Sequence, residues 1–274
     1  MWVAERHRRI LDLLQTHHRL TTEHFAESLG VSRETVRRDL IELERSGQLA
    51  RVHGGAVPPA VAPGVPPEPA YLERTGLQQP QKREIARLAA ALIQPGQACF
   101  LDAGSTTLAL AEELARREGL IVITNSLEAA TALARQPAHE VRLLGGRLET
   151  DVPATYGEQT VAEIGRLQVD WALVSPVGFD AVNGAMDYLW NEATVARAML
   201  GRARQRVVLA DSSKLGQASR IQICPAADVD VLVTDAQADA ALLAAFRAAG
   251  VKRVLGPGQP AADAAGTAGT STGA

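Results

Sequence analysis

The sequence is short of cysteine and of long apolar runs, and each shortage excludes a class of protein. Its 274 residues include only two cysteines, Cys99 and Cys224, too few for a disulfide framework or a cysteine-ligated zinc site. No apolar run approaches the roughly 20 residues that a membrane-spanning helix needs. The opening residues MWVAERHRRI also lack the apolar core of a signal peptide. We therefore expect a soluble cytoplasmic protein with reduced thiols.

Histidine and net charge are scarce as well. His139 is the only histidine in residues 80–256, which leaves no histidine-based metal site or catalytic triad there. We expect neither a metal nor a cofactor. The 28 basic and 31 acidic residues give a net charge of -3. Overall charge therefore gives no sign of nucleic-acid binding, and any such signal must be local.

Proline divides the chain into parts. Six prolines fall within the segment PPAVAPGVPPEP, which begins at Pro58, and they forbid helix and central strand there. We expect residues 58–79 to form a semi-extended linker between an N-terminal domain of residues 1–57 and a C-terminal domain of residues 80–256. Residues 257–274 have no aromatic or large aliphatic side chain, and we expect a disordered tail there.

Three helical patterns follow one another in the N-terminal domain, over residues 4–17, 23–30 and 33–47. The second and third begin after hydroxyl residues suited to capping, Thr22 and Ser32, and a glycine ends each of them. Two helices joined by a short turn around a glycine are typical of a helix-turn-helix, whose second helix enters the major groove of DNA. The following segment LARVHGGAV predicts two short strands, the wing of such a domain.

The third helical pattern has a buried stripe and a basic outer face. Val36, Leu40 and Leu43 are spaced i, i+4 and i+7, which predicts that they face the core. The outer face then carries arginines suited to guanine and phosphate contacts. This domain has nine basic and eight acidic residues, a net charge of only +1, so the signal is the local arginine cluster and not total charge. The alternative is a plain three-helix bundle with a solvated basic face.

The motifs VSRETVRRDL and RVHGGAV make this domain closely resemble the N-terminal domain of the DeoR/GlpR family of bacterial transcription regulators. The resemblance covers the whole domain and implies that residues 20–39 read DNA. The expected DNA-binding residues lie at the start of the third helix, at the start of the second and in the wing: Ser32, Arg33, Thr35, Arg37, Arg38, Thr22, Arg51 and His53.

The C-terminal domain alternates apolar strand-like runs with helical patterns such as residues 106–118 and 191–204. The alternation predicts an α/β fold with a mostly parallel sheet covered on both faces. The predicted strands are 98–102, 120–124, 141–145, 171–175, 207–211, 231–235 and, with a weaker pattern, 251–256.

Ligands of such folds bind where the strands end, and polar residues follow most of the predicted strands here. In DAGSTT, Gly104 allows a tight turn and the next three residues bring hydroxyls to the start of a helix, a seat for phosphate or carboxylate. Lys214 would supply a matching cation. The alternative is that Ser105 and Thr106 only cap a helix.

The motifs LDAGSTT, VITNS, VRLLGG and LADSSKLG resemble the DeoR-type sensor domain, which in turn resembles the ribose-5-phosphate isomerase and CoA-transferase-like fold. The resemblance implies a non-catalytic sensor of phosphorylated sugars or related metabolites. It places these residues in the pocket: Asp102, Gly104, Ser105, Thr106, Thr107, Asn125, Gly146, Gly178, Glu192 and Lys214.

Some residues depart from the family pattern. SPVGF stands where a small GA.G motif is common, and Ala196 stands where the family often has lysine. Tyr188 and Trp190 add aromatic rings that we expect near the pocket, which favours a ligand with an apolar or ring face.

The sequence therefore predicts a DNA-binding transcription repressor, a homodimer or homotetramer, that reads double-stranded operator DNA and responds to a small phosphorylated sugar. Two alternatives remain open from sequence. One is an activator of the same build. The other is an active sugar-phosphate isomerase, with Asp102, Glu192 or Asp211 as general base and Lys214 holding the oxyanion.

Overall fold

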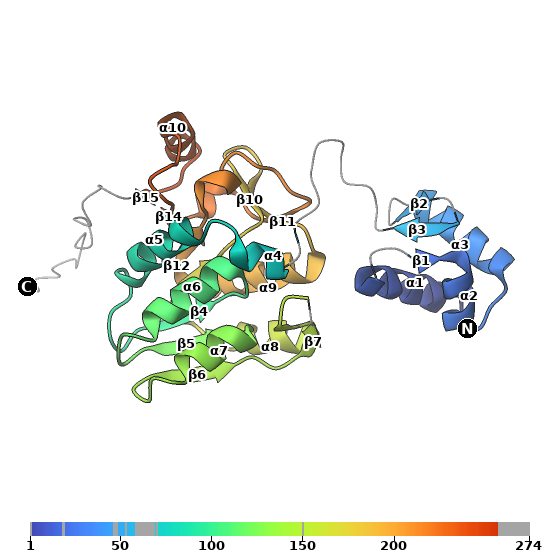
Figure 1. Ribbon diagram of the computed structural model, residues 1–274, viewed down its shortest axis with the longest axis horizontal. Helices are drawn as coiled ribbons and strands as arrows, with labels where there is room; N and C mark the ends of the chain where they lie inside the picture. Colours follow the sequence, from blue (N-terminus) through green and yellow to red (C-terminus); the bar gives the residue numbers. More distant parts are fainter. Residues whose placement is uncertain are drawn as a thin grey trace, which may run out of the picture. The chain divides into compact units, whose positions relative to one another are not determined.

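The computed structural model describes residues 2–17, 20–45, 49–52, 54–57, 69, 71–149 and 151–256. The chain divides between Pro66 and Pro67 into an N-terminal and a C-terminal unit, and each is described by itself below (Figure 1). Most of the predicted linker and the whole predicted tail, residues 257–274, lie outside the described residues.

The N-terminal unit combines three helices with a small antiparallel sheet in the order β1-β3-β2. Its elements are α1 Val3–His17, β1 Leu20–Thr21, α2 Thr22–Leu29, α3 Arg33–Arg45, β2 Ala50–Val52 and β3 Gly55–Val57. The three predicted helices and the two wing strands are confirmed. The predicted stripe of α3 is confirmed too, since Val36, Leu40 and Leu43 are buried against Ile10 and Phe25 in one core. Each such side chain contributes about 1.5–3 kcal/mol by its burial.

The predicted N-cap of α2 is wrong by one residue. Thr21, and not Thr22, caps the helix, because the Thr21 hydroxyl accepts a hydrogen bond from the backbone N–H of His24 at 3.2 Å. Pairing of Thr21 with Gly55 in β1 gives Thr21 the extended backbone that an N-cap needs. Thr22 is already helical and buried.

The C-terminal unit is built on a seven-stranded sheet in the order β15-β14-β12-β9-β4-β5-β6, and all neighbouring strands are parallel. All seven predicted strands are present, with bounds shifted by a few residues. They are β4 Ala98–Leu101, β5 Ile121–Thr124, β6 Glu140–Leu143, β9 Val169–Val174, β12 Ala203–Leu209, β14 Val231–Val233 and β15 Arg253–Leu255.

Helices cover both faces of this sheet, as predicted. Successive residues of β4 belong to different cores: Phe100 packs with Met199 of α9, whereas Leu101 packs with Ile85 of α5 and Leu110 of α6. Figure 1 shows α5, α6 and α7 side by side along one face. The helices are α4 Tyr71–Gly76, α5 Gln79–Ala90, α6 Ser105–Leu114, α7 Leu127–Leu133, α8 Glu158–Gly165, α9 Trp190–Leu200 and α10 Ala240–Ala248.

The shorter strands form two small sheets separate from the large one. Strands β10, β11 and β13 form an antiparallel sheet, and β7 pairs with β8. Their bounds are β7 Arg147–Glu149, β8 Ala154–Tyr156, β10 Gly178–Asp180, β11 Gly184–Asp187 and β13 Ile221–Cys224, and the 3-10 helices are η1 Ser212–Lys214 and η2 Ala226–Asp228.

Two predicted boundaries are wrong. The linker was expected to reach residue 79, but α4 begins at Tyr71, whose side chain is buried, because no proline lies between Pro69 and Pro80 to prevent a helix there. The helix predicted over residues 191–204 ends at Leu200. Its last residues belong to β12, where Ala203 pairs with Val169, so sheet pairing prevails over helical periodicity there.

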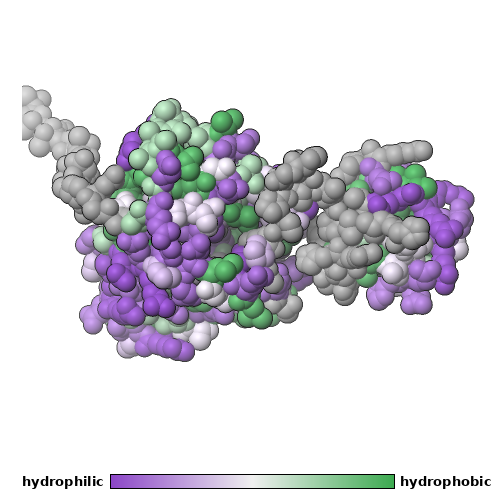
Figure 2. Space-filling view, turned by 45° about the horizontal axis from the view of Figure 1, so that its top comes forward, coloured by the Kyte–Doolittle hydropathy of each residue, from purple (hydrophilic) through white to green (hydrophobic). Residues whose placement is uncertain are grey.

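The surface of the C-terminal unit is largely hydrophilic in the view of Figure 2, with apolar residues gathered near its top, over α10. Within the described ranges, no helix is both long and apolar enough to cross a membrane.

Candidate DNA-reading surface and effector pocket

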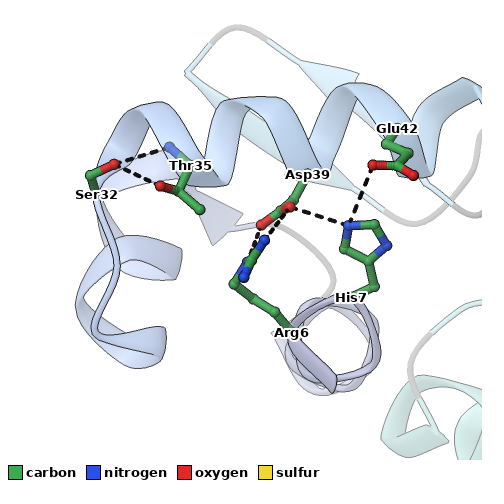
Figure 3. Close-up of polar contacts among 6 residues, drawn as sticks. All are labelled: Arg6, His7, Ser32, Thr35, Asp39 and Glu42. Carbon is green, nitrogen blue, oxygen red and sulfur yellow. Dashed lines mark hydrogen bonds and ion pairs between the residues drawn. The ribbon is translucent and has the colours of Figure 1, made fainter. Parts of the chain in front are cut away.

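The first turn of α3 is fixed by a cap. Ser32 Oγ accepts a hydrogen bond from the backbone N–H of Thr35 at 3.1 Å and lies 2.8 Å from the Thr35 hydroxyl (Figure 3). Ser32 is exposed and Thr35 is half-buried. The predicted N-cap is confirmed, and both predicted DNA-contacting hydroxyls lie at the N-terminal end of the helix.

Asp39 fastens α3 to α1. Its carboxylate is 4% exposed and accepts hydrogen bonds from Arg6, at 2.8 Å from Nη2, and it lies 3.2 Å from His7 Nε2 (Figure 3). Burial by itself raises the pKa of Asp39, but the hydrogen bonds and charges of Arg6 and His7 outweigh it and leave the pKa below its ordinary value. Asp39 thus belongs to the interior of the unit, although it ends the predicted reading segment.

The predicted arginines of α3 stand in solvent. The side chains of Arg33 and Arg37 are 65% and 66% exposed, and Arg38 is exposed as well. Arg33 pairs with Glu23 at 3.0 Å and Arg37 lies 3.8 Å from Glu34. Exposed pairs of this kind contribute about 0–1 kcal/mol, so the guanidinium groups exchange them readily for phosphates.

The wing holds the remaining predicted contacts. Arg51 pairs with Glu44 through its Nε at 3.2 Å and its backbone N–H at 3.0 Å, and its side chain is 42% exposed. Thr22 does not fit the predicted DNA contact, because it is buried and both its hydroxyl and its backbone N–H donate to the carbonyl of Gly54. It anchors the wing to α2 instead. His53 lies outside the described residues.

In the C-terminal unit, the N-terminus of α6 lacks a side-chain cap. Gly104 is the N-cap residue with φ 156°, and no side chain caps the helix, so the alternative that Ser105 and Thr106 cap it is wrong. Thr107 Oγ1 donates to the Gly104 carbonyl at 2.9 Å. Thr106 is completely buried, and its hydroxyl has no hydrogen-bond partner in the described part of the chain. Such an unsatisfied buried group is costly and points to a ligand or water.

Asn125, which follows the next strand along the chain, is also buried and has a polar side-chain atom without a hydrogen-bond partner among the described residues. It follows β5, which pairs with β4 in register, so both polar segments meet at one edge of the sheet. Its side-chain N–H donates to the Thr155 carbonyl at 3.3 Å. Its Oδ1 is buried and accepts no hydrogen bond from the residues that the structure describes.

Three carboxyl groups and one arginine line a small pocket that begins directly after β4. Asp102, Asp187 and Glu192 line it together with Arg74 and Ser175. Asp102 and Asp187 are buried, and burial first, then the charge of Asp187, raises the pKa of Asp102 well above its usual range. This pair therefore retains a proton to higher pH than an exposed pair would.

Lys214 lies at the border of the same pocket. Its ammonium donates to the hydroxyl of Ser175 at 3.1 Å and to the carbonyl of Pro176 at 2.8 Å. Asp211, by contrast, is a structural cap: it is 1% exposed and accepts hydrogen bonds from the backbone N–H and the hydroxyl of Ser213 in η1.

The two remaining predicted pocket glycines have packing roles. A Cβ on Gly146 would lie 2.2 Å from Thr160 Oγ1 and 2.7 Å from the Tyr156 carbonyl. A Cβ on Gly178 would lie 2.4 Å from the carbonyl of Gln217. Close backbone approach therefore explains both glycines, and neither lines the acidic pocket.

The sequence-based prediction missed part of the pocket and misplaced one ring. Arg74 fell in the predicted linker. Asp187 is the last residue of β11, a short strand that no sequence motif marks. Trp190 lines a different, apolar hollow between α8 and α9 and is 64% exposed, so its expected place near the pocket is wrong. The ring of Tyr188 packs under Arg220, whose Cζ lies 3.8 Å from the ring centre.

No group of three or more His, Cys, Asp or Glu residues within the described segments is arranged to hold a metal ion. The pocket is lined by one guanidinium, one hydroxyl and three carboxyl groups, with Ala103, Val152 and Val177 completing the wall.

Comparison with known proteins covers both units. Residues 6–60 match the family described as "DeoR-like helix-turn-helix domain", and residues 77–236 match "DeoR C terminal sensor domain". The HTH-type transcriptional repressor GlcR of Bacillus subtilis is 37% identical over 235 residues, 86% of this chain and 89% of that protein. The glycerol-3-phosphate regulon repressor of Haemophilus influenzae is 33% identical over 229 residues, 84% and 88% of the respective chains.

Among solved structures, ribose 5-phosphate isomerase A from Methanocaldococcus jannaschii is 22% identical and covers 48% of this chain and 52% of its own, with a TM-score of 0.36. A likeness at that level carries no argument about function.

Proposed function

Because the chain belongs to the DeoR family of transcription regulators, we propose that it represses an operon of sugar or carbohydrate metabolism by binding its operator in the cytoplasm. The observation that carries the proposal is the row of exposed arginines on α3, Arg33, Arg37 and Arg38, on a helix whose opposite face is fixed in the core. Arginine forks suit guanine edges and phosphates, and the cap at Ser32 presents the start of the helix to the groove.

The controlling ligand is a phosphorylated sugar or related metabolite. The uncapped N-terminus of α6 and the ammonium of Lys214 suit the phosphate. Carboxylates such as Asp102 and Glu192 suit the hydroxyls of a polyol, which donate to them. Similarity to the glycerol-3-phosphate regulon repressor of Haemophilus influenzae supports this class of effector.

We propose no enzyme activity. Asp211, one of the candidate bases, is engaged as the cap of η1, and the relatives above are regulators. A turnover assay with pentose and hexose phosphates tests this point. Turnover that Glu192→Gln abolishes would establish the isomerase alternative.

The protein acts as a homodimer or homotetramer on a repeated operator. A DNA-binding unit with nine basic and eight acidic residues has little general attraction for DNA, so two such units on two half-sites supply the affinity. Sedimentation of the complex with selected operator DNA gives the number of chains bound.

The DNA-reading surface is tested by gel shift on an operator selected from random DNA. Arg37→Ala or Arg38→Ala should weaken binding by roughly 10-fold or more each, since a bidentate base contact contributes about 1–3 kcal/mol. Arg9→Ala is the matched control, an arginine of α1 that is 55% exposed. Affinity should also fall steeply with salt. Unchanged affinity in both α3 variants would remove the assignment.

The effector class is tested by a thermal-shift screen of sugar phosphates against the same sugars without phosphate. The double variant Ser105→Ala, Lys214→Ala should lose the stabilisation and the release of DNA, while it binds the operator normally. A normal response of this variant would place the pocket elsewhere.

A further inference from the structure

Arg74 lies in α4, a helix that sequence analysis assigned to the linker. The helix begins at Tyr71, two residues after Pro69, so it is the first helix of the C-terminal unit on the path from the DNA-binding unit. The side chain of Arg74 lines the acidic pocket beside Asp102 and Glu192. One residue thus joins the effector pocket to the start of the unit.

Two hydrogen bonds and one buried ring hold α4 against the body of the unit. The Tyr71 hydroxyl donates to Glu128 of α7, and the ammonium of Lys82 donates to the backbone carbonyl of Arg74. The Tyr71 ring is buried in the hydrophobic core, and within α4 the guanidinium of Arg74 lies 5.6 Å from its centre. The helix is therefore seated by Tyr71 and by a hydrogen bond to the backbone of Arg74 itself.

The charges in the pocket make Arg74 sensitive to an anion. Arg74 lines the pocket together with the carboxyl groups of Asp102, Asp187 and Glu192. Lys214 lies at its border, where the ammonium donates to Ser175. A phosphate presents three strong acceptor oxygens and pairs bidentately with arginine. Arrival of a phosphate therefore gives the guanidinium of Arg74 a new partner.

We propose that Arg74 is an effector-binding residue of the pocket, and that its pairing with the phosphate changes the seating of α4, where the chain leaves for the DNA-binding unit. The inference rests on the proposed sugar-phosphate effector. Linkage between ligand and DNA requires two states of the protein that differ physically. In this proposal they differ in the partner of the Arg74 guanidinium.

Hydrogen–deuterium exchange of the full chain tests this inference. The probes are ribose 5-phosphate, glucose 6-phosphate and glycerol 3-phosphate, each against its parent without phosphate. In the wild type, a binding probe should change exchange severalfold both in residues 102–107 and in residues 71–77. Arg74→Ala should weaken the probe at least 10-fold and, at saturation, abolish the change in residues 71–77 alone.

Two further variants keep the test decisive. Arg83→Ala, an exposed arginine of α5, should behave as the wild type. Arg74→Lys keeps the charge without the fork and serves if Arg74→Ala does not fold; it should show a reduced response in residues 71–77.

The outcomes separate the two proposals. Protection of residues 102–107 with no change in residues 71–77, or an Arg74→Ala variant with wild-type affinity, would overturn the role of Arg74 and leave the sugar-phosphate sensor standing. Absence of any protection with all three probes would overturn the effector class and this inference with it.

Discussion

At the scale of single residues, Asp39 shows how a charge is kept inside a small domain. An isolated buried carboxylate is prohibitively costly, so Arg6 and His7 supply the compensating charge and hydrogen bonds. These contacts join α1 to α3. Removal of one partner of a buried pair leaves the other uncompensated.

Asp39→Asn should therefore destabilise the N-terminal unit by about 3 kcal/mol at pH 7. The pKa of Asp39 is lowered in the folded state, so its contribution is present above the unfolded value of about 4 and is lost as pH falls through the folded value. Urea unfolding from pH 7 to pH 3 should show the gap between wild type and variant closing at the acidic end. Glu27→Gln, at an exposed position of α2, is the control, and an equal gap at every pH would contradict the assignment.

Thr106 gives a second prediction at this scale. Its buried hydroxyl has no partner in the described residues, so Thr106→Val, which keeps the shape, should leave stability unchanged or raise it by about 1 kcal/mol. The same change should weaken sugar-phosphate binding roughly 10-fold, the equivalent of about 1.4 kcal/mol. Thr107→Val, which removes the bond to Gly104, should instead cost stability. Calorimetry of both variants checks this, and a destabilised Thr106→Val would mean that its hydroxyl already has a structural partner.

At the scale of elements, the junction of α4 and α5 depends on a buried amine. Lys82 of α5 is 4% exposed and donates to the end of α4. Burial first, then the charge of Lys214, lowers the pKa of Lys82 to about 8, against the opposing attraction of Asp211. An amine whose folded pKa is depressed costs stability while it is charged.

The C-terminal unit should therefore become more stable as pH rises from about 8 to 10.4, because the unfolded chain binds more protons in that interval. The gain should reach at most about 3 kcal/mol, from the shift between the two pKa values. Lys82→Met should flatten this rise. Thermal unfolding at pH 7.5, 9 and 10 measures it, with Lys252→Met, a 70% exposed lysine, as the control. A rise that persists in Lys82→Met would contradict the role of this amine.

Elements differed in how far the sequence predicted them. The three helices of the N-terminal unit and the seven strands have periodicities and glycine ends that are local properties of the chain, and they were predicted. Helix α4 was not, because six residues beside a proline-rich segment carry too little pattern. The end of α9 was misplaced because pairing of β12 with β9 is a non-local interaction.

At the scale of the whole molecule, all the residues of the pocket belong to the C-terminal unit. A fragment of residues 69–256 should therefore fold and bind the same sugar phosphate as the full chain, with a Kd within about twofold, while it loses all operator binding. Calorimetric titration of both proteins measures this. A tenfold weaker fragment would show that the N-terminal unit or the connecting segment contributes to the pocket.

The sequence alone determined the division into two units, the arginine row of α3 and the glycine turn DAGSTT before α6. These depend on spacing, caps and glycines within one segment. Only the tertiary structure decided that Thr22 anchors the wing, that Trp190 lies outside the acidic pocket, and that Arg74 lines one pocket with Asp102 and Asp187. Parallel crossovers bring together strand ends and helices far apart in the chain, and no local pattern records which of them will meet.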